Sequence, residues 1–367
     1  MGFNIGIDIQ STRGKASGLG VYTRNFIEAL KRERPEDMKI TFYSRPDDTD
    51  LNTWQRCFWE NLELPKLARK DNVDVLHVPA FSPPLSRGFR LVVTVHDIIG
   101  KLFPNQLGLP SALYWGKWLP FSIKRADLII ADTEYTKKDL MTHLGVPSEK
   151  IHVIYASGHE GFSSELLPDE KARVKQAYGI REEYFLFVGT LEPRKNLSRV
   201  LEAFAAYRAG RNGHGAQQLV VVGSKDFAHG QYYKKLLREA RLREGDVIFT
   251  GYVSHADLNA LYTASNLLVF PSLYEGFGIP VLEAMASGTP VLTARATSIP
   301  EVAGDAAYYV DPYRVEEIVR GMIDLSENAG LRNSLIKKGL QQKNRFSWDR
   351  TARETLEVYR RVVANGS

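Results

Sequence analysis

Hydrophobic and polar positions along the 367-residue chain form short apolar runs that alternate with longer stretches of helical periodicity. This alternation is typical of parallel β-sheets covered by helices on both faces, because each crossover between parallel strands needs a connecting element. Each half of the chain carries six such runs. The predicted strands are residues 4–9, 39–43, 73–77, 91–95, 128–131 and 151–154, followed by 184–188, 219–222, 247–249, 267–270, 291–293 and 307–310.

Two sets of strands predict two doubly wound α/β domains. The loop-like stretch 155–168 contains Gly158, Gly161 and paired serines, so we place the interdomain hinge there. The predicted Rossmann-like domains are residues 1–162 and 163–346. A helix predicted at 349–363 follows every strand, so the segment 347–367 is expected to pack back across the hinge on the N-terminal domain. Ligands of open parallel sheets bind beyond the carboxyl ends of the strands, which predicts a central cleft between facing domains.

The amino-acid composition limits the classes of protein to which this sequence can belong. An apolar content of 44% supplies two ordinary cores. No stretch approaches the roughly 18 apolar residues of a spanning helix, and the N-terminus lacks the pattern of a secretory signal, so a cytoplasmic location is expected. Cys57 is the only cysteine, which excludes a disulfide within the chain. The net charge of +5 is not clustered, which argues against nucleic-acid binding and leaves an anionic metabolite or an acidic membrane surface as partners.

The most informative segment is 271–290, where Glu275 and Glu283 stand eight residues apart around a Gly-Phe-Gly turn. A strand is predicted before this turn and a helix after it, with Pro280 near the first helical position, where proline is favoured. Glycines at a helix start let backbone N–H groups approach an anion, and carboxylates accept hydrogen bonds from ligand hydroxyls. The pattern predicts a site for phosphate and sugar groups. The alternative is that Glu275 caps the helix and Glu283 is solvated.

A second pattern, Gly189 to Asn196, directly follows the predicted strand 184–188 and precedes a helix for which Asn196 is a favourable N-cap. Gly189 leaves space at the strand end. Arg194 can bind phosphate with two parallel hydrogen bonds, and Lys195 supplies a point charge. This arrangement predicts stabilisation of a leaving diphosphate. An ordinary surface pair of cations is the alternative.

Weaker patterns follow two strands of the first half. The loop 11–20 leads into a helix predicted at 21–32, and its Gly18 and Gly20 permit close approach to a phosphate. The loop matches neither a Walker loop nor a complete Rossmann pattern, so a plain flexible turn is the alternative.

His96 and Asp97 follow the predicted strand 91–95. His96 is expected to hydrogen-bond a substrate hydroxyl or to carry a proton, with Asp97 orienting it or capping the next segment. A structural histidine is the alternative. No His-x3-His and no cysteine cluster occurs, so no metal site is expected. A Gly-x-Ser-x-Gly nucleophile elbow is also missing from the sequence.

Aromatic residues gather in two segments that also carry cations. A mixture of this kind suits an interfacial surface, whereas helices that bury an aromatic stripe are the alternative. The residues are Trp54, Arg56, Phe58 and Trp59, then Tyr114, Trp115, Lys117, Trp118, Phe121 and Lys124.

Residues Glu275 to Glu283 resemble the Glu-x7-Glu motif of the retaining GT-B glycosyltransferases of family four, the group-1 glycosyltransferases. Gly189 to Asn196 resembles the basic diphosphate motif of that family. The resemblance covers nearly the whole chain and is strongest over 184–310. It implies an acceptor-binding domain at 1–162, a donor-binding domain at 163–346, and a C-terminal helix at 347–367 that packs on the first domain.

The same resemblance implies roles for individual residues. Arg194 and Lys195 would bind the nucleotide diphosphate, Glu275 the donor sugar, and Glu283 the ribose. His96 would contact the sugar near the reacting carbon and, with Arg194, Lys195 and Glu275, make up the catalytic set. The other implied donor-binding residues are Gly18, Gly20, Gly189, Tyr252, Val253, Gly276, Phe277, Gly278 and Leu282.

The implied activity is retaining, metal-independent transfer of a hexosyl unit from a nucleotide-diphosphate sugar to a glycan or lipid-linked acceptor in bacterial polysaccharide or lipopolysaccharide assembly. No cofactor besides the donor is implied. The resemblance favours a mannosyltransferase that uses GDP-mannose, with glucosyl, N-acetylglucosaminyl and rhamnosyl donors as alternatives. Peripheral association with the cytoplasmic face of the inner membrane is a further expectation. A sugar-nucleotide epimerase of the same fold and a non-catalytic nucleotide-sugar-binding protein are the rival functions.

Overall fold

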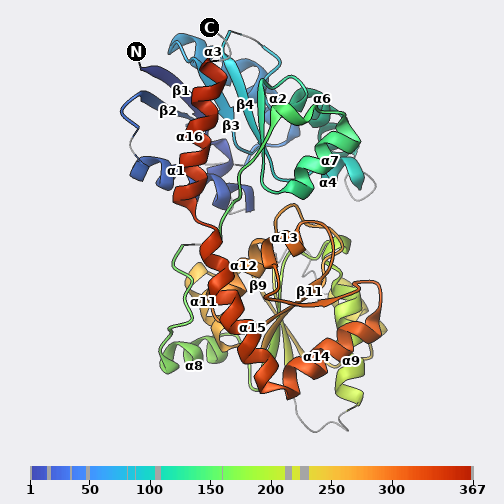
Figure 1. Ribbon diagram of the computed structural model, residues 1–367. Helices are drawn as coiled ribbons and strands as arrows, with labels where there is room; N and C mark the ends of the chain where they lie inside the picture. Colours follow the sequence, from blue (N-terminus) through green and yellow to red (C-terminus); the bar gives the residue numbers. More distant parts are fainter. Residues whose placement is uncertain are drawn as a thin grey trace. The chain divides into compact units, whose positions relative to one another are not determined.

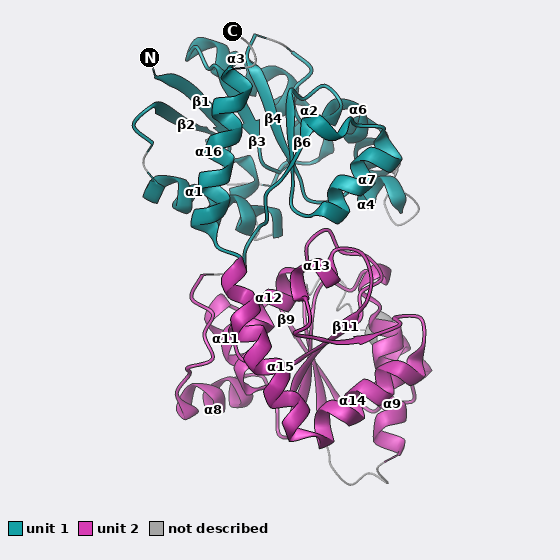
Figure 2. Cartoon of the chain, viewed as in Figure 1, with its two compact units in different colours: residues 1–157, 346–367 teal, residues 158–345 magenta. Residues whose placement is uncertain are grey.

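The computed structural model describes residues 2–14, 18–33, 35–46, 50–80, 82–86, 88–103, 109–158, 160–210, 217–223 and 231–364 (Figure 1). Residues 15–17 of the glycine-containing loop and residue 159 of the hinge loop lie outside this description. The chain divides into two compact units (Figure 2). Unit 1 consists of Met1–Ser157 and Phe346–Ser367, and unit 2 of Gly158–Arg345.

Each unit is built on a six-stranded parallel sheet, with the order β2-β1-β3-β4-β5-β6 in unit 1 and β12-β11-β10-β7-β8-β9 in unit 2. All twelve predicted strands are confirmed, with ends that differ by two residues at most. The strands are β1 (Phe3–Asp8), β2 (Met38–Tyr43), β3 (Val75–Val78), β4 (Arg90–Val95), β5 (Leu128–Ala131), β6 (Ile151–Val153), β7 (Tyr184–Val188), β8 (Gln218–Val222), β9 (Val247–Gly251), β10 (Leu267–Phe270), β11 (Val291–Ala294) and β12 (Tyr308–Val310).

Helices connect the strands. In unit 1 the helical elements are η1 (Gln10–Thr12), α1 (Gly18–Glu33), α2 (Thr53–Phe58), η2 (Trp59–Glu63), α3 (Leu64–Lys70), α4 (Ile99–Leu102), α5 (Leu109–Leu113), η4 (Tyr114–Trp118), α6 (Leu119–Ile123), α7 (Glu134–Leu144), η5 (Ser148–Lys150) and α16 (Trp348–Ala364). In unit 2 they are α8 (Pro168–Ala177), η6 (Pro193–Lys195), α9 (Leu197–Ala209), α10 (Gln231–Glu239), α11 (His255–Ala264), α12 (Ile279–Ala286), α13 (Ile299–Ala303), α14 (Val315–Glu327), α15 (Ala329–Gln342) and η8 (Lys343–Arg345). None of the helices in the described ranges is both long and apolar enough to cross a bilayer.

The central strands consist of consecutive apolar residues, because helices cover both faces of each sheet. The strand β7 is buried along its whole length, and Phe185 within it packs edge-on against Phe204 and Tyr207 of α9. Burying one large apolar side chain stabilises a fold by about 1.5–3 kcal/mol. The sheet interior therefore holds the strand ends, and the loops that leave them, in fixed positions.

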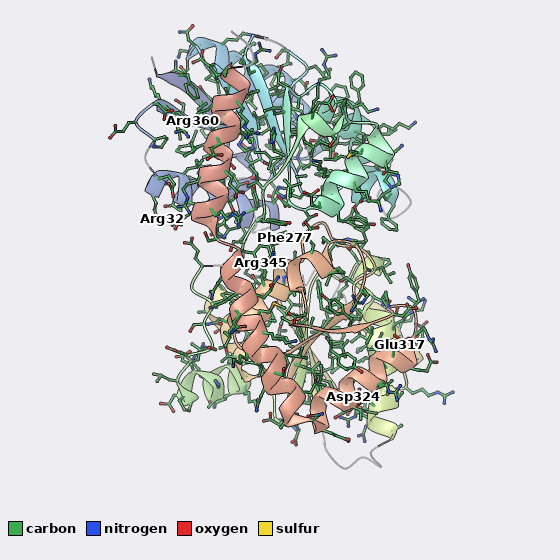
Figure 3. All side chains as sticks on the ribbon, in the orientation of Figure 1. Arg32, Phe277, Glu317, Asp324, Arg345 and Arg360 are labelled. Atoms are coloured by element: carbon green, nitrogen blue, oxygen red, sulfur yellow. The ribbon has the colours of Figure 1, made fainter. Side chains whose placement is uncertain are left out.

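The last helix, α16, belongs to unit 1 and packs along α1. Asp349 of α16 pairs with Arg32 at 2.7 Å, and Arg360 pairs with Asp37 at 2.8 Å; both arginines are labelled in Figure 3. Exposed pairs of this kind contribute little to stability. The helix is held mainly by its buried face, which includes the fully buried Tyr359.

The start of α1 differs from the prediction. Gly18 and Gly20 lie in the first turn of this helix, which begins three residues earlier than expected, and not in a loop. Gly20 is buried, and Tyr22 and Phe26 continue the buried face of the helix. The alternative of a plain flexible turn at these two glycines is therefore wrong, and their approach to a phosphate stays a prediction.

Candidate functional site

Two loops separated by about eighty residues meet in unit 2 because their strands are neighbours. Leu267 and Leu268 of β10 pair with Phe185 and Leu186 of β7, so both strands end at the same edge of the sheet. Beyond that edge the amide of Leu273 donates a hydrogen bond of 2.7 Å to the carbonyl of Arg194. The loop after β7 and the loop after β10 therefore form one structure.

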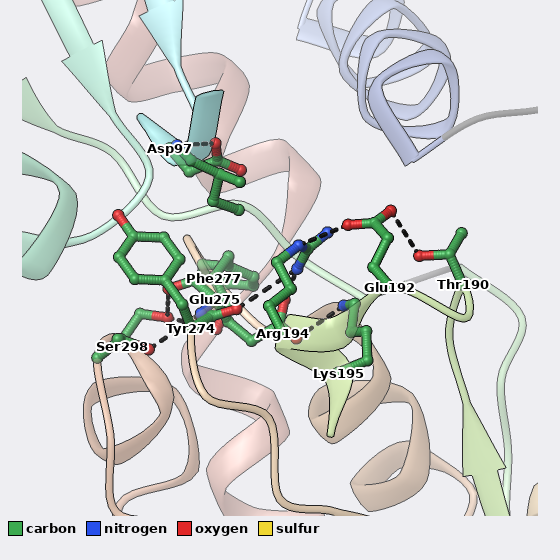
Figure 4. A network of polar contacts seen from close by, with 11 residues as sticks. Asp97, Thr190, Glu192, Arg194, Lys195, Tyr274, Glu275, Phe277 and Ser298 are labelled. Carbon is green, nitrogen blue, oxygen red and sulfur yellow. Dashed lines mark hydrogen bonds and ion pairs between the residues drawn. The ribbon is translucent and has the colours of Figure 1, made fainter. Parts of the chain in front are cut away.

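A cluster of charged side chains lies where these two loops meet (Figure 4). Lys195 Nζ lies 2.7 Å from Glu275 Oε1, and Arg194 Nη1 lies 3.4 Å from Glu275 Oε2. Arg194 Nε donates to Glu192 Oε2 at 2.7 Å, and Thr190 Oγ1 donates to the other oxygen of Glu192 at 2.7 Å. Lys195 is 8% exposed and Glu275 6% exposed. The two cations are therefore not an ordinary surface pair.

Burial and the ion pair with Arg194 shift the pKa of Glu192 in opposite directions. Burial alone raises the pKa of this carboxyl, and the charge of Arg194, with the hydrogen bonds from Thr190 and Arg194, brings the pKa below its usual value. Glu192 is thus ionised and orients the Arg194 guanidinium. The sequence pattern did not single out this glutamate, although it stands inside the predicted diphosphate segment.

A third loop, after β11, fixes the turn that carries Glu275. Ser298 Oγ donates to the carbonyls of Glu275 at 2.9 Å and Phe277 at 3.2 Å, and the Glu275 amide donates to Thr297 Oγ1 at 3.1 Å. Sequence reasoning missed Thr297 and Ser298. Their place beyond the carboxyl end of the strand next to β10 is the signal that would have identified them.

Helix α12 begins directly after Gly278, which is its N-cap and has a φ of 102°. A Cβ atom at this position would lie 2.5 Å from Ile299 Cδ1, so both the backbone and the packing require glycine. Pro280 lies in the first turn, as predicted. The N-terminal N–H groups of such a helix can bind an anion. Glu275 does not cap this helix, so that alternative is wrong.

Asn196 occupies the N-cap position of α9 but does not cap it with its side chain. Its Nδ2 instead donates to the carbonyls of Pro271 at 3.0 Å and Pro312 at 2.7 Å. The backbone has a φ of 64°, a left-handed conformation that asparagine tolerates better than most residues. The local capping rule failed because two carbonyls from distant loops use the side chain.

Glu283 lies in the second turn of α12 and faces the interior, with 6% exposure. Tyr262 of α11 donates its hydroxyl hydrogen to Glu283 Oε2 at 3.1 Å. Burial raises the pKa of Glu283 to about 7, and the Tyr262 hydrogen bond opposes this rise. The alternative of a solvated helix position is therefore wrong.

The other predicted donor-binding residues of unit 2 fall into two groups. Gly276, Phe277 and Leu282 are buried in the turn or in α12. Tyr252 and Val253 follow β9, the outermost strand, which is two strands away from β7. Within the described ranges they make no hydrogen bond or ion pair with the charged cluster, and Tyr252 is 61% exposed.

Gly189 directly follows β7 and lies close to Gly223, a glycine that sequence reasoning missed. A Cβ atom on Gly223 would lie 2.1 Å from the carbonyl oxygen of Gly189, so that position also requires glycine. The Gly189 amide donates to the carbonyl of Val222 at 2.9 Å. The edge of the sheet is therefore closely packed at the start of the loop after β7, which carries Arg194 and Lys195.

His96 lies in unit 1 at the end of β4, and both of its ring nitrogens have partners. Nδ1 lies 2.6 Å from Asp132 Oδ2, and Nε2 lies 2.8 Å from the carbonyl oxygen of Pro79. The Pro79 carbonyl only accepts hydrogen bonds, so Nε2 carries a proton. Burial lowers the pKa of His96, but Asp132 and the Pro79 carbonyl outweigh burial and raise the pKa above its usual value.

In this geometry neither ring nitrogen of His96 is left for a substrate hydroxyl, which is the first of its two expected roles, whereas the raised pKa favours the second role, carrying a proton. Asp97 does not orient it. Asp97 Oδ1 accepts from the amide of Ile99, the first residue of α4, at 2.9 Å, although the N-cap residue of that helix is Ile98. Asp132, which orients the ring, was missed although it follows the strand next to β4.

The two aromatic segments of unit 1 contain both buried and exposed rings. Trp59 and Tyr114 are buried, whereas Trp54 is 77% exposed and Phe58 and Phe121 are about half exposed. Neither of the two alternatives for these segments holds throughout. The buried rings surround a polar group that sequence reasoning missed.

That group is Glu60, which is fully buried and accepts hydrogen bonds from Ser82 Oγ and from the Tyr114 hydroxyl. Trp118 Nε1 donates to Ser82 Oγ at 3.2 Å. Burial raises the pKa of Glu60 to about 8. Glu60 lies in the first turn of one π-helical segment and Tyr114 begins the other, a rare geometry that is frequent at functional sites.

Comparison with known proteins gives matches in both units. The family model for "Glycosyl transferases group 1" matches residues 169–342, and that for "Glycosyltransferase Family 4" matches residues 16–156. The O-antigen chain mannosyltransferase B of Escherichia coli is 31% identical over 290 residues, which is 78% of this chain and 74% of that protein. Three serotype-specific mannosyltransferases of Escherichia coli are 30% identical over 293 residues, and there the matched part is only 34 to 35% of the relative.

Solved structures share the fold. Sucrose-phosphate synthase from Thermosynechococcus elongatus superposes with a TM-score of 0.76 at 19% identity, over 99% of this chain and 100% of that one. Anabaena HepE in complex with UDP-glucose gives 0.70 at 17% identity, over 97% and 99%. The predicted class of two Rossmann-like parallel-sheet domains of GT-B type is confirmed. With a family model matched in each unit and the Glu-x7-Glu and diphosphate segments joined at one sheet edge, the chain belongs to the group 1 glycosyltransferases, family four.

Proposed function

We propose that the protein is a retaining hexosyltransferase that takes its sugar from a nucleotide diphosphate and needs no metal ion for the transfer. The observation that carries the proposal is the convergence of Lys195 and Arg194 on Glu275 beside the N-terminus of α12. Two cations and a row of helix N–H groups suit a diphosphate, and a carboxylate suits sugar hydroxyls. The acceptor is a glycan or a lipid-linked saccharide of bacterial polysaccharide assembly.

In the proposed mechanism the acceptor hydroxyl attacks the anomeric carbon from the face that the diphosphate leaves. The bond between the anomeric carbon and the phosphate oxygen breaks, the new glycosidic bond forms, and the acceptor proton passes to the departing phosphate oxygen. Lys195 and Arg194 stabilise the charge that develops on that oxygen. Glu275 holds sugar hydroxyls, and Glu283 holds the ribose.

GDP-mannose is the first candidate donor because relatives of 30 to 31% identity are mannosyltransferases. UDP-glucose is the main alternative, since HepE of the same fold binds it. A thermal-shift screen over sugar nucleotides tests the choice. A ligand at 100 times its dissociation constant stabilises the folded protein by about 2.7 kcal/mol, which is a measurable rise in Tm.

The reaction itself is tested with the donor that binds. Transfer to an acceptor with an α-linked product from an α-linked donor, measured by the anomeric coupling in NMR, supports a retaining transferase. An inverted product contradicts the retaining mechanism. Loss of activity with a chelator that magnesium restores contradicts metal independence. A new sugar nucleotide formed from donor alone would identify an epimerase.

We also propose that unit 1 docks on an anionic lipid surface. Six large apolar side chains of the segments 53–70 and 109–123 are more than a third exposed, and the segments touch where the Arg56 guanidinium lies 5.7 Å from the Tyr114 and Trp115 rings. Exposed lysines stand among them, which suits phosphatidylglycerol. The apolar residues are Trp54, Phe58, Leu62, Leu67, Leu113 and Phe121, and the lysines Lys66, Lys117 and Lys124.

Sedimentation with vesicles tests this docking. Binding to vesicles that contain phosphatidylglycerol, lost with the double variant Trp54→Ser/Phe58→Ser, is the expected result. The matched control is Tyr313→Ser, which changes a ring of comparable exposure in unit 2. Equal binding of all three proteins, or no binding of the wild type, contradicts the proposal.

A further inference from the structure

Tyr262 and Glu283 form an isolated pair inside unit 2. Tyr262 is fully buried in α11, where its ring centroid lies 5.9 Å from that of Phe162 and its carbonyl accepts from Thr289 Oγ1 at 2.7 Å. Its hydroxyl is thereby held 3.1 Å from Glu283 Oε2. The tyrosine thus fixes the position of one carboxyl oxygen.

The surroundings of Glu283 differ from those of Glu275, although both glutamates belong to the same motif. Glu275 has two cationic partners, Lys195 and Arg194. Glu283 makes no ion pair with any described residue, and the hydroxyl of Tyr262 is the one side-chain donor recorded for it within the described ranges. A carboxylate can accept about four hydrogen bonds, so the ionised form of Glu283 is poorly satisfied in the free protein.

Other elements packed against α12 do not change this picture. Tyr262 is the titratable group that α11 directs at Glu283. No charged side chain of the neighbouring elements forms a salt bridge with Glu283 within the described ranges. The charged residues of these elements are Glu301 of α13, Arg332, Lys337 and Lys338 of α15, and Lys343 and Arg345 of η8. The raised pKa of Glu283, about 7, agrees with a carboxyl group that lacks a compensating cation.

We propose that Tyr262 is a positioning residue for Glu283, and that binding of the donor's nucleoside converts the Glu283 carboxyl to a carboxylate and releases one proton to water. The inference rests on the proposed function, in which Glu283 binds the ribose. Two ribose hydroxyls donate the hydrogen bonds that the ionised form lacks in the free protein, and such bonds favour the charged acceptor. The O–H bond of the protonated carboxyl breaks, and solvent takes the proton.

The direction of the pH dependence follows from this linkage. Protonation of free Glu283 competes with binding, so the affinity for the donor falls as the pH drops through about 7. If the bound form stays ionised, the dissociation constant at pH 6 is about ten times that at pH 8. The released proton amounts to about 0.9 per site at pH 6, about 0.5 at pH 7 and about 0.1 at pH 8.

Isothermal titration calorimetry of the full chain measures both quantities. GDP-mannose and UDP-glucose are titrated at the three pH values in buffers with different heats of ionisation, which gives the protons released directly. Sugar nucleotides are preferred to free diphosphates because a terminal phosphate would itself titrate near pH 6. The expected result is proton release that follows the stated fractions, with affinity rising toward pH 8.

Two variants separate positioning from packing. Glu283→Gln is expected to bind more weakly at every pH, with no proton release and a flat pH profile. Tyr262→Phe removes the hydrogen bond that lowers the pKa of Glu283, so its profile shifts to higher pH and its binding recovers toward the wild-type value at about pH 8.5. A purely structural role for Tyr262 would weaken binding equally at all pH values.

Failure of the inference and failure of the proposed function give different results. Donor binding and sugar transfer without proton release, and with a flat affinity profile, overturn the inference and leave the glycosyltransferase proposal in place. Binding of neither sugar nucleotide at any pH contradicts the proposed function, and the inference with it.

Discussion

Replacement of Lys195 by methionine tests the charged cluster most directly. Methionine keeps an unbranched apolar side chain but deletes the charge of Lys195 Nζ, which lies 5.1 Å from the centroid of the Phe270 ring. Glu275 then loses its partner at 2.7 Å and keeps only Arg194, at 3.4 Å. Removing one partner of a buried ion pair costs about 3–5 kcal/mol, and the remaining arginine places the expected loss of stability near the lower figure.

The same change removes a charge from the proposed leaving-group site. Losing one preorganised donor of this kind costs about 2.7–4 kcal/mol in the activation barrier, which lowers kcat about a hundredfold to a thousandfold. Urea unfolding followed by circular dichroism measures the first effect, and sugar transfer at saturating donor measures the second. Lys337→Met, on an exposed position of α15, is the matched control and should change neither.

A double variant keeps the test valid if the single variant unfolds easily. Lys195→Met/Glu275→Gln leaves no orphaned carboxylate, so it should regain most of the lost stability without regaining transfer. Near-normal kcat in folded Lys195→Met would refute the catalytic role of the lysine. Unchanged stability of the single variant would refute the argument that the Glu275 carboxylate needs this cation.

Three further predictions concern other parts of the molecule. Glu60 lowers the stability of the wild type by up to about 5 kcal/mol as pH rises from about 5 to above 8, because the folded carboxyl holds its proton to about pH 8 whereas the unfolded one ionises near 4.5; Glu60→Gln should remove this part of the slope in urea unfolding and leave the part due to Glu283, and equal slopes would contradict it. Asp132→Asn should lower the pKa of His96, which a pH titration followed by ¹⁵N NMR of the imidazole detects; an unchanged titration curve argues against Asp132. Gly278→Ala should destabilise the protein by about 1–3 kcal/mol, because its φ is positive and the added Cβ meets Ile299; an unaltered Tm is incompatible with that strain.

The sequence was sufficient for the strands and for the meeting of the two main loops. A buried parallel strand is a continuous apolar run, so its place can be predicted from local composition alone. Once β7 and β10 are strands of one sheet, their carboxyl ends lie on the same edge, and Arg194, Lys195 and Glu275 must lie near that edge. The positions of these three residues near the edge follow from the strand order, whatever the side-chain conformations are.

Residues that act through a distant partner could not be predicted in this way. Tyr262 looks like one more apolar position of a helix, and only the packing of α11 on α12 brings its hydroxyl to Glu283. Asn196 follows the rule for a helix cap in sequence, but two loop carbonyls use its side chain. Local patterns predict which groups are buried, whereas the partner of a buried polar group depends on the whole fold.

In the proposed transfer, the charges of the cluster give its cations a way to favour the transition state over the bound donor. Lys195 and Arg194 are matched by Glu275 and Glu192, so the four groups sum to zero before a ligand arrives. An incoming diphosphate therefore finds no surplus of positive charge, and it must share cations that already have partners. When the bond to the sugar breaks, charge accumulates on the leaving oxygen and its hold on the cations strengthens at the expense of the carboxylates. An interaction that grows during the reaction accelerates the chemical step, whereas one that is complete in the bound donor does not.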